Sequence, residues 1–283
     1  MMNTMTMTWC QLRISCLLKN VLERVPQAAL GCALIAAVLT LLPETGRSQP
    51  CAPVPPGLVG WWTGDNTAQD EVGGAHGTLV GNAGYAPGRV GAAFSFDGSG
   101  DAVNLGNPAA LQLQDFTIEA WIQRTSLDWA NHGMILASGL DGYGFSLTEN
   151  GTLYLSFIGH SSVESAAQVA DTGWHHVAVT KSGSVVVFYL DGTAYLAPDF
   201  YGELLFEWNV AIGASGDFYA NSFGGLIDEL SVYSRALSAA EVAAISAAGS
   251  SGKCAWQAPR IVAQPQSQTV TVGASATLSV SAS

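Results

Sequence analysis

The sequence predicts an all-β protein, a two-sheet antiparallel β-sandwich of the jelly-roll type with one short C-terminal helix. Short apolar runs recur between residues 57 and 249, turn-forming dipeptides separate them, and 32 glycines accompany a charged fraction of only 11%. About a dozen strands and a single helix pack most simply as two apposed sheets. The 283 residues allow one domain of roughly 200 residues with flanking segments.

The first 48 residues predict an export signal. Residues 28–42 read AALGCALIAAVLTLL, an apolar run of 15 residues that follows Lys19 and Arg24. A membrane-spanning helix needs about 20 residues, so this run fits the apolar region of a secretory signal peptide better. An uncleaved N-terminal membrane anchor is the alternative. We therefore expect a secreted or cell-surface protein.

Two cysteines remain once that segment is removed, and they bracket the strand-rich region. Cys51 precedes the first predicted strand, and Cys254 follows the predicted helix. Cysteines of exported chains are usually paired, so we predict a Cys51–Cys254 disulfide that joins the ends of one domain, residues 51–254. Two free thiols are the alternative.

The first strands follow directly from apolar patterning. Residues 58–62 and 93–96 are short apolar runs. Residues 116–122 (FTIEAWI) alternate, which places Glu119 and Trp121 on the face opposite the other apolar side chains.

Turn dipeptides define the middle of the domain. An Asn-Gly pair joins residues 144–148 to residues 152–157, and an Asp-Gly pair joins residues 185–190 to residues 193–196. Asn-Gly accepts positive φ at both turn positions, as a type I′ hairpin requires, and we interpret the Asp-Gly turn in the same way. Residues 174–180 precede the second hairpin, so three strands form a meander.

The last strand and the helix close the domain. Residues 225–233 (GLIDELSVY) read as a strand. Ser238 and Glu241 have the spacing of a capping box, which predicts a short helix over residues 238–245.

The pattern of the amino-acid sequence changes after Cys254. Residues 255–265 indicate a linker, and residues 269–273 and 276–280 alternate as two further strands. Two strands cannot bury a core by themselves. Residues 266–283 therefore read as the truncated start of a second β domain.

The order of these segments resembles a known family. The segments are GLVGWWTGDNTAQDEVGGAHGTL, FSFDGSGDAVNLG, FTIEAWI, WHHVAVT, VVVFYLDG and GGLIDELSVYSRALSAAEVAAI. In this order they resemble the bacterial laminin-G-like, concanavalin A-like lectin/glucanase domain over residues 57–249. The C-terminal QPQSQTVTVGASATLSV resembles the first strands of a bacterial immunoglobulin-like domain. The resemblance implies a module of a larger surface or extracellular protein.

The resemblance also implies a possible calcium site. Carried over by motif, its ligands are Asp70 and Asp228, with Asp65 as a helper. Calcium takes six to eight oxygens from carboxylates and loop carbonyls. Strand alternation places Asp228 on the face opposite Glu229, so those two cannot share an ion without distortion. The alternative is that these aspartates only cap turns.

A second candidate site is an aromatic surface for stacking sugar rings. The loop-like and strand-end segments supply Trp129, Tyr143 and Tyr219 as candidate ligand-binding residues, with Trp208 and Phe218 in the same class. Burial in the core is the commoner fate of aromatic residues and is the alternative.

The sequence lacks signs of catalysis. Glucanases of similar fold carry carboxylates at alternate positions of one strand, as E-x-D-x-E, and this chain has no such run. It has no G-x-S-x-G motif, and His175 and His176 lack metal-ligand spacing. We expect the histidines to be structural and the protein not to be an enzyme.

Charge narrows the range of partners. Residues 49–283 contain 6 basic and 20 acidic residues, a surface that repels nucleic acid and anionic lipid. We therefore expect a non-catalytic extracellular module that binds a glycan or an extracellular protein. The alternatives are a structural or adhesive spacer without a small ligand, and an accessory domain of a secreted glycoside hydrolase.

Overall fold

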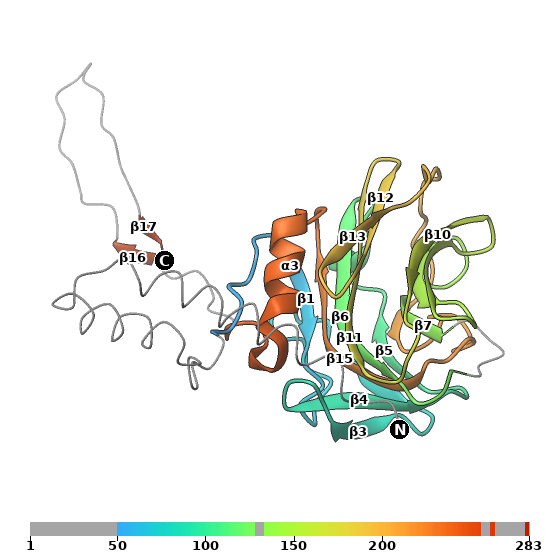
Figure 1. Cartoon of the computed structure of the whole chain (residues 1–283), viewed down its shortest axis with the longest axis horizontal. Coiled ribbons are helices and arrows are strands. Elements are labelled where there is room, and N and C mark those ends of the chain that lie inside the picture. Colours follow the sequence, from blue (N-terminus) through green and yellow to red (C-terminus); the bar gives the residue numbers. More distant parts are fainter. Residues whose placement is uncertain (1–49, 128–132, 256–260, 264–280, 283) are drawn as a thin grey trace, which may run out of the picture. The chain divides into compact units, whose positions relative to one another are not determined.

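Two antiparallel β-sheets face one another, and a helix lies on the outer side of the larger sheet (Figure 1). The computed structural model describes residues 50–127 and 133–255, together with the backbone of residues 261–263 and 281–282. The predicted fold class is confirmed, since the described part pairs all its strands of the two sheets in antiparallel fashion and ends in one short α-helix.

The larger sheet has eight strands. In spatial order they are β13 (Thr193–Leu196), β12 (Val185–Leu190), β11 (Trp174–Ser182), β6 (Phe116–Arg124), β15 (Gly224–Tyr233), β4 (Ala92–Asp97) and β3 (Gly84–Pro87), with β1 (Leu58–Trp62) paired to β15. The predicted meander is therefore present at one edge as β11, β12 and β13.

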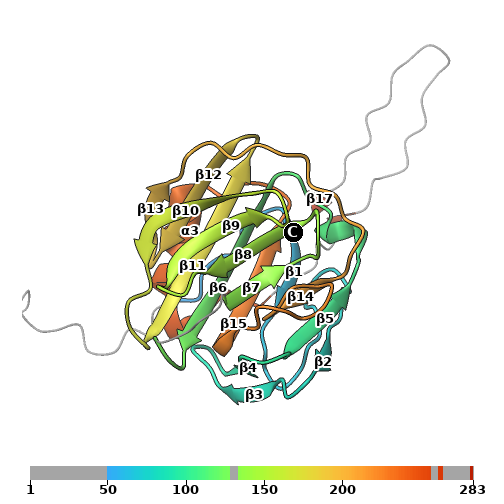
Figure 2. The same cartoon turned by 90° about the vertical axis from the view of Figure 1, so that its right-hand side faces the viewer.

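The smaller sheet has seven strands and is seen face-on in Figure 2. Their order is β10 (Ser161–Gln168), β9 (Thr152–Phe157), β8 (Tyr143–Leu147), β7 (Gly133–Ala137), β14 (Val210–Ile212), β5 (Ala102–Gly106) and β2 (Thr78–Val80). A short 3-10 helix, η2 (Ala109–Leu111), separates β5 from β6.

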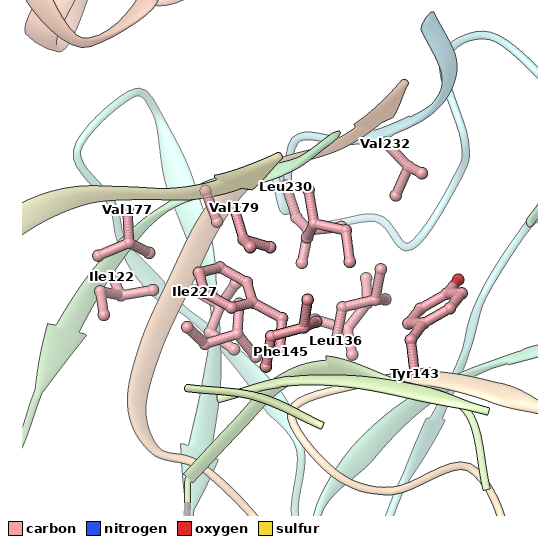
Figure 3. Packing of buried hydrophobic residues seen from close by; sticks show 14 of the residues in the cluster. Ile122, Leu136, Tyr143, Phe145, Val177, Val179, Ile227, Leu230 and Val232 are labelled. Atoms are coloured by element: carbon pink, nitrogen blue, oxygen red, sulfur yellow. The ribbon is translucent and has the colours of Figure 1, made fainter. Parts of the chain in front are cut away.

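The main core lies between the two sheets. Ile122, Val177 and Ile227 of the larger sheet point toward Leu136 and Phe145 of the smaller one (Figure 3). All five are fully buried. Complete burial of such a side chain is worth about 1.5–3 kcal/mol, so these inward faces provide the main driving force for bringing the sheets together.

A second apolar layer lies outside the larger sheet. Tyr189 and Tyr233 of the sheet pack in one cluster with Val242 and Ile245 of α3 (Ala239–Ala248). The helix begins at the predicted capping box and continues, through Ala248, beyond the predicted end. A 3-10 turn, η3 (Gly249–Ser251), follows it.

The two predicted hairpin turns differ from each other. Asp191 and Gly192 both have positive φ, 50° and 79°, as the type I′ prediction requires. In the other hairpin only Gly151 has positive φ, 82°, and its N–H donates to the carbonyl of Thr148 at 2.8 Å. The type I′ prediction is therefore wrong at Asn150. The chain forms a three-residue loop instead, with glycine at the left-handed position.

Several short strands were not predicted. β2 and β14 have three residues each, too few to show a period. β10 (SSVESAAQ) alternates between buried and exposed positions, but serine and alanine occupy buried positions where the pattern expects large apolar residues. Its amphipathicity becomes visible only once the strand is paired with β9.

The C-terminal region is described in part. β16 (Ile261–Ala263) pairs with β17 (Ser281–Ala282), so part of the expected linker is a strand. The export signal expected in residues 1–48 and the strands expected at 269–273 and 276–280 lie outside the described residues. The immunoglobulin-like domain stays a prediction. Among the described residues, α3 included, no helix has the length and hydropathy to cross a bilayer.

The two ends of the sandwich domain meet and are covalently joined. Cys51 and Cys254 form the predicted disulfide, with Cα atoms 4.8 Å apart. Beside it, Ala52 forms a parallel bridge with Lys253, and the N–H of Cys254 donates to the carbonyl of Ala52 at 2.8 Å.

We expect the disulfide to be a major contribution to stability. It closes a loop with a sequence separation of 203 residues, for which chain entropy gives an upper figure of about 5 kcal/mol. The double variant Cys51→Ser/Cys254→Ser should lose several kcal/mol of unfolding free energy in urea titrations. Reduction of the wild-type protein should reproduce the loss. Coincident urea midpoints for the oxidised wild type and the variant would exclude this role.

Candidate functional site

Asp70 organises the loop that follows β1. Its carboxylate is buried; Oδ1 accepts hydrogen bonds from the N–H groups of Trp61 and Val72, and Oδ2 from those of Gly73 and Ala75, all at 3.0 Å. Four backbone donors therefore occupy the acceptor positions of one carboxylate. This arrangement holds the loop against the strand.

Asp65 and Asp228 contact a different loop, between β3 and β4. Asp65 Oδ1 accepts from the N–H of Ala92 at 2.7 Å, and Asp228 Oδ2 accepts from the N–H of Val90 at 2.8 Å. Both aspartates therefore hold the connection between β3 and β4. Asp65 precedes this connection in the chain and Asp228 follows it.

The three aspartates do not fit a shared calcium ion. Asp70 is saturated by backbone donors in one loop, whereas Asp65 and Asp228 serve another. Within residues 50–127 and 133–255, no group of three or more His, Cys, Asp or Glu side chains is arranged to hold a metal ion. Calcium binding stays a prediction without an identified set of ligands.

A β-bulge in β15 changes the faces that its carboxylates occupy. The pairing with β6 shifts register between Asp228 and Ser231, and Glu229 has a φ of 58°, rare for a residue other than glycine. Ile227 and Leu230 both point into the core (Figure 3). Asp228 and Glu229 consequently lie together on the outer face. The prediction that they face opposite sides is wrong, because the extra residue shifts the alternation.

A buried network of charges connects this bulge to the end of the domain. Lys253 Nζ lies 3.1 Å from Glu119 Oε1 and 3.2 Å from Glu229 Oε2. His176 Nε2 donates to Glu119 Oε2 at 3.0 Å. The four side chains are almost completely buried, and the Lys253 ammonium lies 5.1 Å from the ring centroid of Trp61.

Burial and the shared ammonium set the protonation of this network. Burial raises the pKa of Glu119, but Lys253 and the hydrogen bond from His176 outweigh it and hold the pKa below its usual value. At Glu229, burial has the larger effect and raises the pKa, although the same Lys253 ammonium lowers it. Burial lowers the pKa of Lys253, but the two carboxylates outweigh it and raise the pKa. Burial, with repulsion from Glu229, raises the pKa of Asp228 to about 7.

The other predicted structural histidine lies nearer the surface. His175 hydrogen-bonds to Asp171 at 3.0 Å and to Asp191 at 2.8 Å. Burial lowers its pKa, but the two carboxylates outweigh this effect and raise it. Both adjacent histidines therefore have carboxylate partners within the fold.

The structure separates the predicted ligand-binding aromatics. Tyr143 is the first residue of β8; it is 1% exposed, and its hydroxyl donates to the carbonyl of Leu111 at 3.1 Å. Its assignment as a surface residue is wrong, because the core covers it. Tyr219 is half-buried against a small alanine cluster. Trp129 lies outside the described residues, so its role stays a prediction.

An exposed aromatic pair is present instead at the loops of the smaller sheet. Trp208, before β14, and Phe218, after it, have ring centroids 5.9 Å apart with planes inclined at 49°. They are 37% and 77% exposed. We call this pair, with the adjoining Glu207 and Asp217, the Trp208–Phe218 surface. The sequence placed both aromatics in loop-like segments but did not distinguish them from the others.

A glycine allows these loops to approach one another. A Cβ atom on Gly139, in the β7–β8 loop, would lie 2.6 Å from Cβ of Trp208 and 2.8 Å from Cβ of Asp217. Hydrogen bonds complete the connection: the N–H of Gly216 donates to the carbonyl of Ser138 at 3.1 Å. Three loops therefore support the aromatic pair.

Comparison with known families identifies the fold. Residues 97–243, more than half of the chain, match the family model described as the concanavalin A-like lectin/glucanases superfamily. The chain belongs to this superfamily. No curated protein sequence matches it. Membership confirms the resemblance found in the sequence segments of the sandwich domain.

Solved structures with this superfamily fold share little sequence with the chain. Domain 4 of an extracellular arabinanase from Geobacillus stearothermophilus, in complex with arabinotriose, has a TM-score of 0.56 at 19% identity and covers 66% of this chain and 96% of that one. The binding domain of Paraclostridial Mosquitocidal Protein 1 has a TM-score of 0.52 at 16% identity, covering 67% and 52%. Trypanosoma rangeli sialidase has 0.51 at 20% identity, covering 70% and 35%.

These likenesses establish a common fold. This chain spans nearly all of the arabinanase domain but about half of the mosquitocidal binding domain and about a third of the sialidase. The sandwich is therefore a unit that also occurs within longer proteins.

We expect Lys253 to be essential for the stability of the layer that packs outside the larger sheet. In Lys253→Met the charge of Glu119 remains buried without its cation, which typically costs 3–5 kcal/mol. The matched control is Arg235→Met, which removes the more exposed Arg235–Glu241 pair and should cost about 1 kcal/mol or less. Equal losses of unfolding free energy in the two variants would contradict the role given to the buried network.

Asp228 should make stability depend on pH. Its pKa of about 7 in the folded chain lies above its ordinary 3.8, so the stabilisation from protonated Asp228 is complete at acid pH and is lost as the pH rises through 7. Asp228→Asn should remove this dependence. Between pH 5 and pH 8, the difference in unfolding free energy should therefore shift by roughly 1–3 kcal/mol in favour of the variant over the wild type. Parallel stability curves for the two proteins from pH 5 to pH 8 would contradict this.

Proposed function

We propose that residues 51–254 form a non-catalytic extracellular carbohydrate-binding module, with the Trp208–Phe218 surface as its sugar contact. The observation that carries the proposal is the exposed aromatic pair supported by three loops. Exposed aromatic side chains supply large contact area at low cost in conformational entropy. A stacking surface of this kind needs no further chemistry to retain a sugar chain.

The fold is compatible with this role. A domain of the same fold was solved with arabinotriose in an extracellular arabinanase, and we extend glycan binding to this chain as a hypothesis. The disulfide between Cys51 and Cys254 supports an oxidising, extracellular location. Glycan binding is preferred here over binding to an extracellular protein.

The placement of the carboxylates supports a non-catalytic role. Glycoside hydrolysis needs two carboxyl groups on either side of an accessible bond. Glu119, Asp228 and Glu229 are gathered in the larger sheet, but they are buried and are engaged with Lys253, His176 or the β3–β4 loop. Carboxylates buried and engaged in this way are not positioned on either side of an accessible bond.

Glycan-array binding of the full chain, followed by titration with the best oligosaccharide, tests the proposal. Trp208→Ala and Phe218→Ala should each weaken binding about tenfold or more, as loss of a central aromatic contact does. Leu196→Ala, at an apolar residue on β13 that is about as exposed as Phe218, is the control and should bind normally.

The outcomes separate the rival functions. Loss of binding in the two aromatic variants, with unchanged thermal unfolding, supports the proposal. Absence of binding to every glycan by correctly folded protein would reject it and favour the structural or adhesive spacer. Binding that survives both substitutions would place the sugar contact elsewhere.

A further inference from the structure

Each ring of the Trp208–Phe218 surface follows a carboxylate in the chain. Glu207 precedes Trp208, and Asp217 precedes Phe218. Asp217 Oδ1 accepts a hydrogen bond from the N–H of Phe218 at 2.7 Å, while its Oδ2 accepts none from the described residues. Glu207 is exposed. Each ring therefore has a carboxylate as its chain neighbour, and Asp217 also packs against the same glycine, Gly139, as Trp208.

No lysine or arginine of the described residues is available to neutralise them. Each of these cations is engaged elsewhere in the fold: Arg89 over the Trp121 ring, Arg124 with the carbonyls of Val169 and Glu149, Lys181 with the carbonyl of Gln114, Arg235 with Glu241, and Lys253 with Glu119 and Glu229. Among the histidines, His160 is itself paired with Asp141. The charged residues next to the two rings in the chain are therefore both acidic.

Charge and ring chemistry favour the same kind of ligand. A negative potential repels carboxylated and sulfated sugars and attracts cations. The faces of tryptophan and phenylalanine also attract ammonium groups through their quadrupoles. A sugar that carries a protonated amine satisfies both features, since its ring can stack while its ammonium pairs with Glu207 or Asp217.

Resting on the proposed function, we infer that the Trp208–Phe218 surface selects amino sugars: it binds glycans whose hexosamine residues carry a free, protonated amine more tightly than their N-acetylated counterparts, and does not bind acidic glycans. Glu207 and Asp217 determine this preference, and the two rings supply the affinity common to charged and neutral sugars.

The experiment compares three soluble probes on the full chain: tetramers of glucosamine, of N-acetylglucosamine and of a uronic acid. Titrations at pH 6 and low salt should give about two- to fivefold tighter binding of the glucosamine tetramer than of the N-acetylated one, the range expected for an exposed ion pair. The uronic acid tetramer should not bind. Added salt, or a pH that deprotonates the amine, should remove the preference.

Variants separate charge selection from sugar binding. In Glu207→Gln/Asp217→Asn, affinity for the glucosamine tetramer should fall to that of the N-acetylated tetramer, whose binding should be unchanged. Glu71→Gln, an exposed carboxylate in the loop beside β1, is the matched control and should keep the preference. Trp208→Ala should weaken binding of both tetramers.

The two proposals fail in different ways. Equal binding of the glucosamine and N-acetylated tetramers, both lost in Trp208→Ala, overturns the charge selection and leaves the carbohydrate-binding function intact. Binding of neither tetramer overturns the amino-sugar assignment, and the glycan array then decides the proposed function. A preference that persists in Glu207→Gln/Asp217→Asn overturns the role given to the two carboxylates.

Discussion

The outer layer of this domain depends on the ion pairs that the ammonium group of Lys253 makes with buried carboxylates. Lys253 belongs to the last segment of the domain, yet it lies buried between carboxylates of two central strands, with Glu119 on β6 and Glu229 on β15. A charge so placed must be paired, because unpaired burial costs several kcal/mol. The segment that carries Lys253 is thereby held on the sheet, and the adjacent Cys254 is brought to Cys51.

The bulge in β15 makes that contact possible. Regular alternation would direct Glu229 into the apolar core, where Ile227 and Leu230 lie instead (Figure 3). The left-handed backbone at Glu229 turns its carboxylate outward, next to Asp228. Backbone strain is thus accepted at one residue, and the ion pair with Lys253 offsets it. Burial of the Asp228 carboxylate, together with repulsion from the neighbouring Glu229, raises the pKa of Asp228.

The stabilising contacts and the proposed sugar-binding surface lie in different parts of the domain. The helix α3 lies on the outer side of the larger sheet (Figure 1). Ala52, next to the disulfide, packs in the same cluster as α3, and Lys253 of the charge network precedes Cys254. The Trp208–Phe218 surface is built from loops of the smaller sheet, where loop changes leave the sandwich core intact. Such a division lets a common fold carry different ligand preferences, since the loops set the chemistry at the surface.

The sequence by itself determined the sandwich, the paired cysteines and the capped helix, because period-2 patterning, turn dipeptides and cap residues are local signals. Tertiary structure alone decided which carboxylates share a face, since the bulge at Glu229 arises from pairing between distant strands. It also decided that Tyr143 is buried while Trp208 and Phe218 are exposed. Exposure depends on what the rest of the chain packs against a residue, and no local pattern contains that information.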